Sequence, residues 1–392
     1  MRFLHFGILA GLIAAFIPLS PGHAGQFRVL FTFKGYNTGG VPQGGVILGP
    51  DNTLYGETAA GGTAPCKAKY GDPRNGCGTV YSLSKAGGFK VLVSFHGANG
   101  AYGISGLTLV GNALYGATEY GGEYNKGVIF SVNTDGSNFT LLHQFDGTDG
   151  SDPHGPLIPG PNGSFYGFTV SGGPNFPNQS PGVIFSLSPT GAVTILHVFS
   201  AADGYNPTTL VMTPSGILVG GTYFGGPPNP NYCTQGCGVV FSLDPTTSQY
   251  TVLKTYDGSA GTGSPFIGSV AADGTIYGND EDLFSIDLAG NYQILGYSSP
   301  CYTGDTPQSG PALAPDGTLY GTYSSGGCSI AGSLYSDSSI NPGALSLDYI
   351  FGSPQTGYTP YAQPLILPNG VVIGTTNLTS GDNGGTIWEY VP

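Results

Sequence analysis

The densest acidic cluster in the sequence is Asp280, Glu281 and Asp282, which lie between two apolar runs. Two carboxylates close together, one of them protonated by its surroundings, can hydrolyse a glycosidic bond. Asp149 or Asp203 could supply the second carboxylate from another loop. This chemistry would be that of a carbohydrate hydrolase or lyase. The alternative, which we favour, is that the three residues form a solvated hairpin turn.

A second acidic pattern is Asp146, Asp149 and Asp152, three residues apart in the loop DGTDGSD. Oxygen ligands at this spacing could hold Ca²⁺. Related loops elsewhere in the chain keep the glycines but mostly lack the acids. We therefore favour solvated turn residues, and expect no cofactor unless Ca²⁺ binds here. His143 and His197 share one repeated strand position, which favours a place on an outer strand over a catalytic role.

Common catalytic and nucleotide-binding signatures, such as HExxH, GxSxG and a phosphate loop, do not occur. The long loops are instead rich in tyrosine among Asn, Ser and Gly. Such rings offer flat apolar faces and hydroxyls to a glycan or a protein surface, or they simply stiffen the loops. The candidate ligand-binding residues are Tyr102, Tyr120, Tyr205, Tyr223, Tyr302, Tyr323 and Tyr358.

Charge narrows the range of partners. Only 8% of residues are charged, and the net charge is −13 with 10 Lys and Arg. Phosphate backbones and anionic membranes attract clustered cations, so we expect neither nucleic acid nor a membrane surface as a partner. A neutral glycan or a cell-surface protein suits this composition better.

The elements that would position these side chains are repeated. A strand of the type LYGxT recurs seven times, with glycines at Gly56, Gly116, Gly167, Gly220, Gly278, Gly321 and Gly374. A later strand in each repeat carries an aromatic residue, which we expect to pack between neighbouring units. Four strands in about fifty residues are typical of a β-propeller blade. We predict an all-β, seven-bladed propeller of four-stranded blades.

The order of the strands also predicts how the ring closes. The chain begins with an isolated outer strand, residues 27–33, and ends with a blade that lacks one. The N-terminal strand should therefore complete the C-terminal blade and remove the open sheet edge. The connections from the fourth strand to the next first strand, and from the second to the third, are long. In a propeller both classes lie on one face, around the channel mouth, and loops there carry function.

The N-terminus and the cysteines indicate export. Residues 1–24 have the basic start, apolar core and small-residue cleavage site of a signal peptide, which leaves 25–392 as the propeller. Six cysteines fit an oxidising compartment, and local pairs are the simplest arrangement: Cys66 with Cys77, Cys233 with Cys237, and Cys301 with Cys328. Zinc is the less favoured alternative for Cys233 and Cys237. We expect a secreted or periplasmic monomer without a membrane span.

The combination of LYGxT, a double glycine, G[TV][VI][FY]SL and LHxF resembles the GloVer-type tandem repeat of exported bacterial proteins with varied C-terminal anchors. The resemblance covers nearly the whole mature chain and implies a secreted propeller, with no settled activity. Two departures stand out. The sequence ends at Pro392 without an anchor, which favours a free secreted form. Blade five has Asn279 to Asp282 in place of the double-glycine loop, which should leave a notch.

These observations favour a secreted propeller that binds a glycan or a surface protein on its loop face without catalysis. One alternative is the carbohydrate-active hydrolase or lyase on the same face. Another is an envelope interaction scaffold with no small ligand.

Overall fold

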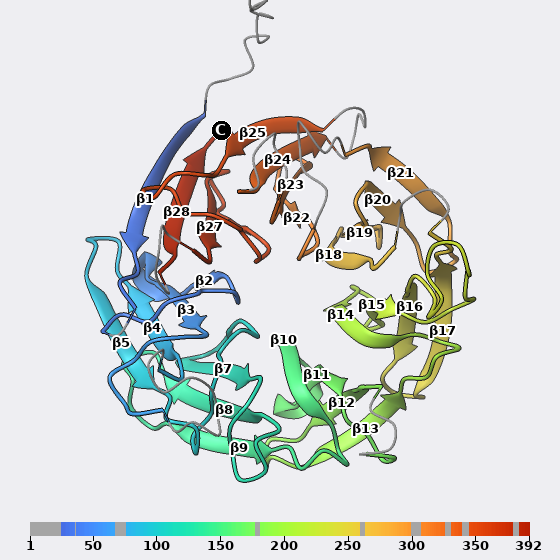
Figure 1. The fold of residues 1–392 in the computed structure, drawn as a ribbon, viewed down its shortest axis with the longest axis horizontal. Helices are drawn as coiled ribbons and strands as arrows, with labels where there is room; N and C mark the ends of the chain where they lie inside the picture. The colour runs from blue at the N-terminus through green and yellow to red at the C-terminus, as the bar shows by residue number, and fades with distance from the viewer. Residues whose placement is uncertain are drawn as a thin grey trace, which may run out of the picture.

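The computed structural model describes residues 25–35, 37–66, 76–176, 181–258, 263–298, 307–325, 331–338, 345–378 and 384–392. The predicted signal peptide, Cys301, Tyr302 and Cys328 lie outside these residues. Within them the chain forms seven four-stranded antiparallel sheets arranged as a ring (Figure 1). The prediction of an all-β, seven-bladed propeller is confirmed.

Each of blades 1 to 6 runs outward from the central axis in chain order, and β1 adds the outermost strand of blade 7. The strands of blades 1 to 3, innermost first, are β2 (Val46–Leu48), β3 (Leu54–Thr58), β4 (Thr79–Leu83) and β5 (Phe89–Ser94); β6 (Thr108–Val110), β7 (Ala113–Thr118), β8 (Val128–Asn133) and β9 (Thr140–Gln144); β10 (Ser151–Pro159), β11 (Phe165–Ser171), β12 (Val183–Leu187) and β13 (Val193–Val198). Short 3₁₀ turns, η1 (Pro50–Asn52) and η3 (Pro161–Gly163), join the first two strands of blades 1 and 3.

Blades 4 to 7 follow the same plan. Their strands are β14 (Tyr205–Met212), β15 (Leu218–Phe224), β16 (Val239–Asp244) and β17 (Gln249–Thr255); β18 (Phe266–Val270), β19 (Ile276–Asn279), β20 (Leu283–Ile286) and β21 (Tyr292–Gly296); β22 (Ala312–Leu313), β23 (Thr318–Tyr323), β24 (Ser333–Ser338) and β25 (Ser346–Ile350); β26 (Leu365–Ile366), β27 (Val372–Thr376), β28 (Thr386–Val391) and β1 (Gln26–Thr32).

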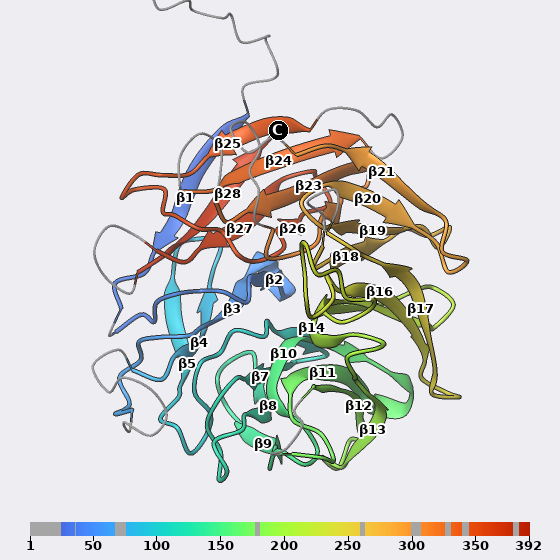
Figure 2. The ribbon, with the colours of Figure 1, turned by 45° about the vertical axis from the view of Figure 1, so that its right-hand side comes forward.

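The ring closes as the strand order predicts. β1 pairs antiparallel with β28, from Gln26 opposite Val391 to Thr32 opposite Thr386. Figures 1 and 2 show β1 beside β28, on the rim of the blade that the C-terminus builds. Backbone hydrogen bonds between the two ends of the chain therefore hold the first and last blades together, and neither edge is left open.

The repeated glycine and the repeated aromatic residue of each blade form one packing unit. A β-carbon at Gly56 would collide with the ring of Tyr81, and one at Gly374 with Trp388. The same relation holds in all seven blades, and every one of these rings is buried. Clusters such as Phe130 with Phe95 then fill the space between adjacent blades. The aromatic residues are therefore core residues, as predicted.

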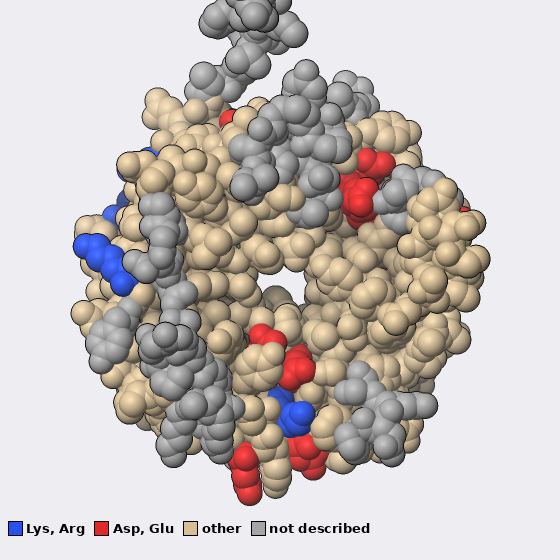
Figure 3. All heavy atoms as spheres, in the orientation of Figure 1, with Lys and Arg blue, Asp and Glu red and all other residues tan. Residues whose placement is uncertain are grey.

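Both long classes of connection lie on one face. Isolated bridges join fourth-to-first connections with second-to-third connections, as between Ala101 and Tyr120 and between Tyr358 and Leu378. A similar bridge joins Pro307 with Tyr323, the last residue of β23. This face, the loop face, is turned toward the viewer in Figures 1 and 3, and an opening is visible at its centre. Two of the predicted disulfides, Cys66–Cys77 and Cys233–Cys237, are present on it. Among the described residues, no helix has the length and apolarity that a membrane crossing requires.

Candidate functional site

All seven blades contribute a side chain to one cavity at the mouth of the channel. The cavity has a volume of about 480 Å³. Each blade contributes one residue that lies in its innermost strand or just before it. These residues, here called the mouth ring, are Gln43, Ile104, His154, Thr208, Phe266, Gln308 and Tyr361. No sequence motif pointed to these residues, and none of them is among the seven candidate ligand-binding tyrosines.

A simple local rule positions the mouth ring. In six blades the ring residue directly follows a proline, and in blade 2 it follows Gly103. Each of these preceding residues is buried, whereas the ring residues are half-buried except for the buried Phe266. Successive side chains of an extended chain point in opposite directions. Because the proline is buried, the side chain of the next residue points into the channel. The repeated pair of a proline and the residue after it was the feature of the sequence from which the mouth ring could have been predicted.

The mouth ring contains no Lys, Arg, Asp or Glu, and His154 contributes one imidazole. It offers two amides, a phenol, a hydroxyl and two apolar side chains. Thr208 donates a hydrogen bond of 2.6 Å to the Pro265 carbonyl, which ties blade 4 to blade 5. Such a ring can bind by hydrogen bonding and by contact with an apolar face. It holds no pair of carboxylates for acid–base hydrolysis.

A second cavity of about 440 Å³ continues from the mouth across blades 4 and 5. It shares Tyr223, Phe224, Phe266 and Gln308 with the mouth cavity. The Cys233–Cys237 disulfide and Tyr232, whose side chain is 63% exposed, form its outer wall. We call this cavity the side groove. Together the two cavities make an aromatic-lined surface that leads from the channel toward the rim.

The side groove ends at the acidic turn of blade 5. β19 and β20 are joined by Asp280, Glu281 and Asp282 alone, as the predicted notch requires. Glu281 lines the groove and has a positive φ of 91°. Figure 3 shows acidic side chains gathered where Figure 1 places the turn between β19 and β20.

The other two carboxylates of this turn face elsewhere. Asp280 is fully buried, and its Oδ2 accepts a hydrogen bond of 3.0 Å from the Tyr292 hydroxyl. Burial raises the pKa of Asp280 to about 6, although the hydroxyls of Tyr256 and Tyr292 lower it. Oδ1 of Asp282 accepts a hydrogen bond from the Ser298 backbone N–H. Glu281 is thus the one carboxylate among the described lining residues of the two cavities.

The predicted tyrosines divide between the cavities and the loops. Tyr223 lines both cavities, and burial raises its pKa. Tyr323 is fully buried and donates a 2.5 Å hydrogen bond to the Glu281 carbonyl. Its ring therefore packs between blades and does not reach solvent. Tyr302 lies outside the described residues.

The remaining predicted tyrosines stiffen the loop face away from the mouth. Tyr102 and Tyr120 meet edge to face with ring centroids 5.5 Å apart. Tyr205 stacks on Phe224 and donates a 2.7 Å hydrogen bond to Gln235. Tyr358 pairs through its backbone with Leu378. These four are half-buried, and the described cavity linings do not include them.

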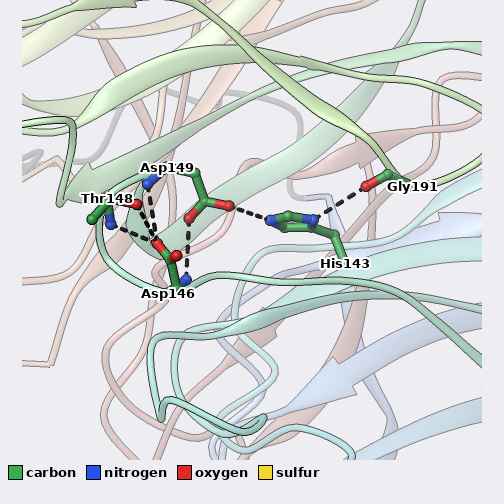
Figure 4. A network of polar contacts seen from close by, with 5 residues as sticks. All are labelled: His143, Asp146, Thr148, Asp149 and Gly191. Carbon is green, nitrogen blue, oxygen red and sulfur yellow. Dashed lines mark hydrogen bonds and ion pairs between the residues drawn. The ribbon is translucent and has the colours of Figure 1, made fainter.

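The three aspartates of DGTDGSD are not brought together around a common point. Asp146 accepts hydrogen bonds from the backbone and hydroxyl of Thr148, and Asp149 contacts His143 with Nε2 and Oδ2 2.6 Å apart (Figure 4). Asp152 instead accepts a hydrogen bond from the Ser171 hydroxyl. Across the described part of the chain, no group of three or more His, Cys, Asp or Glu side chains is placed to hold a metal ion.

The histidine contacts connect blades. Nδ1 of His143, on β9, lies 3.1 Å from the carbonyl of Gly191 in blade 3 (Figure 4). In the next blade, His197 lies 3.2 Å from Asp203 and stacks on Tyr250 of blade 4, with ring centroids 3.8 Å apart. Asp149 and Asp203 are therefore engaged near the rim, and neither lines a cavity with Glu281. Each histidine and its aspartate, six residues apart, fasten one blade to the next.

Glu57 is a buried acid that sequence reasoning missed. It lies on β3 at the interface with blade 2, and both carboxylate oxygens are buried without a hydrogen-bond partner. Burial raises its pKa well above the usual value. Asn279 occupies the same position in blade 5, but there the side-chain amide donates a 2.6 Å hydrogen bond to the Tyr335 hydroxyl. Blade 2 has Phe130 in the position of Tyr335, so Glu57 lacks this partner.

The sequence matches the family model of the Gloeobacter/Verrucomicrobia repeat over residues 16–229 and again over 67–282. No curated protein matches the sequence.

Several solved structures share the fold. A virginiamycin B lyase from Staphylococcus aureus is 12% identical, with a TM-score of 0.60 over 94% of this chain and 100% of the lyase chain. A puromycin hydrolase is 14% identical, with a TM-score of 0.56 over 86% of this chain and 50% of its own. The extracellular domain of a putative hybrid two-component system from B. thetaiotaomicron is 11% identical, with a TM-score of 0.56 over 91% and 39% of the two chains. At these identities the likeness concerns the fold alone.

Proposed function

This chain belongs to the Gloeobacter/Verrucomicrobia repeat family, and from that premise we propose that it is an exported propeller that binds a neutral glycan at the mouth ring and side groove. The observation that carries the proposal is the convergence of one side chain from each of the seven blades on a single cavity. The two disulfides fit an oxidising compartment outside the cytoplasm.

The chemistry of the lining supports a neutral, hydroxyl-rich ligand. Tyr223 and Tyr361 provide ring faces for the apolar side of a sugar. Gln43 and Gln308 provide amides that both donate and accept hydrogen bonds to hydroxyls. A charged polymer would find no complementary cluster here, because Glu281 and His154 are the only ionisable side chains besides tyrosine along the described linings.

Carbohydrate hydrolysis is the second function to test, because one acidic side chain, Glu281, lines the groove. Its positive φ is a conformation that non-glycine residues rarely adopt. A glycosidase of the usual kind needs a second carboxylate across the sugar. The buried Asp280 and the backbone-bound Asp282 do not fill that role in this arrangement, so binding without cleavage is the better-supported function.

The test is a panel of neutral and acidic polysaccharides incubated with the mature protein, with retention and reducing-sugar release measured in the same samples. We expect retention of a neutral polysaccharide without release. Tyr223→Ala and Tyr361→Ala should each weaken retention, because each removes a ring from the cavity lining. The matched control is Tyr297→Ala, which removes a tyrosine that is 68% exposed and lies outside both linings.

Equal loss in the control variant would show that the exposed aromatic surface, and not the mouth, retains the polymer. Sugar release that stops in Glu281→Gln would identify an enzyme and overturn the binding proposal. If no polysaccharide is retained, the glycan proposal fails, and a cell-surface protein becomes the partner to seek on the same face.

A further inference from the structure

The seam between blades 7 and 1, where the ring closes, is packed differently from other blade interfaces. In three blades the glycine of the turn between third and fourth strands lies against the outer strand of the preceding blade. Gly136 lies against Leu92, Gly191 against Leu142 and Gly290 against Leu253. Gly87 is the equivalent glycine of blade 1, yet a β-carbon there would meet no atom within 4 Å. The corresponding leucine on β1, Leu30, therefore lacks this contact with the turn glycine.

Leu30 and Gly87 both line a cavity of about 500 Å³ at this seam, here called the seam cavity. Leu54 and Leu83 of blade 1, with Val371 and Ile373 of blade 7, are buried and form its apolar floor. They belong to the core cluster that joins the two blades. The half-buried Leu30 and Leu48 form the sides. The turns at Asn52 and Asn369 place this cavity on the face opposite the channel-mouth loops.

The rim of the seam cavity carries one uncompensated positive charge. Arg28 and Glu389 form a bidentate pair, with distances of 2.8 and 3.1 Å. Both oxygens of Glu389 are thus engaged. Lys85 is exposed at the same rim and forms no ion pair with a described residue. An apolar cavity with a spare ammonium group at its edge is complementary to an anionic amphiphile.

We propose that the seam cavity binds a small amphipathic anion, with an alkyl chain against the leucine floor and a carboxylate beside Lys85. This site is separate from the mouth ring, because the linings of the two have no residue in common. Binding at the seam would also contact both the first and the last blade, and so stabilise the closed ring.

The probe is decanoate, titrated into the mature protein below its micelle concentration and followed by calorimetry. We expect saturable binding of one decanoate per chain and weaker binding of decyltrimethylammonium, which has the same chain and the opposite charge. Lys85→Glu should weaken decanoate binding by about five- to tenfold. The matched control is Lys90→Glu, which makes the same charge change on β5, outside the cavity lining.

Leu48→Trp provides a second, charge-neutral test, because the larger ring should fill the cavity and abolish binding while the far-UV circular dichroism is unchanged. Absence of saturable binding to the wild-type protein would overturn the proposal. The proposal would also be overturned if Lys85→Glu and Lys90→Glu weakened decanoate binding equally, or if decanoate and decyltrimethylammonium bound with equal affinity. Retention of polysaccharide at the mouth is unaffected by any of these results, so the two proposals fail independently.

Discussion

Glu57 and Gly116 lie in contact across the interface of blades 1 and 2, so that a β-carbon on Gly116 would collide with the Glu57 carboxylate. The hydroxyl of Tyr335 lies in the same way against Gly321 in blade 6. In blade 2 the carboxylate of the preceding blade therefore fills space that a phenol hydroxyl fills elsewhere. A carboxyl group can take this place most readily when it is protonated, because charge is costly in an apolar interior.

Glu57 should make the folded protein less stable as the pH rises. Burial raises the pKa of Glu57 above its usual 4.5. The stability that the protonated side chain contributes is therefore fully present below that pH and is lost as the pH rises through the folded-state pKa. Glu57→Gln should therefore increase the free energy of unfolding at pH 7 and leave it unchanged at pH 4. Urea unfolding at a series of pH values measures this. Glu123→Gln, at an exposed position, should show no such gain, and an equal gain there would contradict the assignment.

Burial of Asp280 should likewise make the folded protein less stable as the pH rises. Its pKa rises from 3.8 to about 6 on burial, so stability should fall between about pH 4 and pH 6. Asp280→Asn keeps an oxygen for the Tyr292 hydroxyl and should stabilise the protein at pH 7 by up to about 3 kcal/mol. Asp273→Asn is the control and should destabilise the protein, because backbone and hydroxyl hydrogen bonds from Thr275 lower the pKa of Asp273. Stabilisation by both substitutions would contradict this account.

The His143–Asp149 contact should stabilise the junction of blades 2 and 3. Both side chains are mostly buried and their nitrogen and oxygen atoms are 2.6 Å apart. A double-mutant cycle with His143→Ala and Asp149→Ala should give a coupling energy of about 1 to 2 kcal/mol. The His197–Asp203 pair, at 3.2 Å, should couple more weakly. A coupling energy near zero for His143 and Asp149 would mean that the contact contributes only packing.

Calcium should not stabilise the DGTDGSD loop. The carboxylate of Asp146 is engaged by Thr148, and those of Asp149 and Asp152 by His143 and Ser171. A ligand that binds only the folded state raises the melting temperature. We therefore expect the same melting temperature in excess Ca²⁺ and in excess chelator. A rise with Ca²⁺ that disappears in Asp149→Ala would place an ion in this loop.

The two disulfides should differ in what their removal affects. Cys66–Cys77 closes a segment with a separation of 11 residues, and Cys233–Cys237 one of 4. From loop length alone, their loss should cost about 3 and about 2 kcal/mol of unfolding free energy. Only Cys233 and Cys237 line the side groove. Replacing that pair by serine should therefore weaken polysaccharide retention, whereas replacing Cys66 and Cys77 should lower stability with retention unchanged.

The repeat pattern by itself determined the architecture. The recurrence of LYGxT with a later aromatic residue sets the content of a blade, because the glycine makes room for that ring in each of the seven sheets. The isolated strand at residues 27–33 determined how the ring closes. An unpaired edge strand and a blade that lacks one strand can pair their free backbone N–H and C=O groups with each other. These features depend on local pattern and on strand order, which a sequence states directly.

Only the tertiary structure decided which residues form the site. Among the tyrosines that the sequence singled out together, Tyr223 lines two cavities, whereas Tyr323 is buried between blades. Glu57 and Asn279 hold equivalent positions, but the neighbouring blade gives a hydrogen-bond partner to Asn279 alone. These outcomes depend on side chains from different blades, often more than forty residues apart. Their meeting is set by the packing around the ring, which no single repeat encodes.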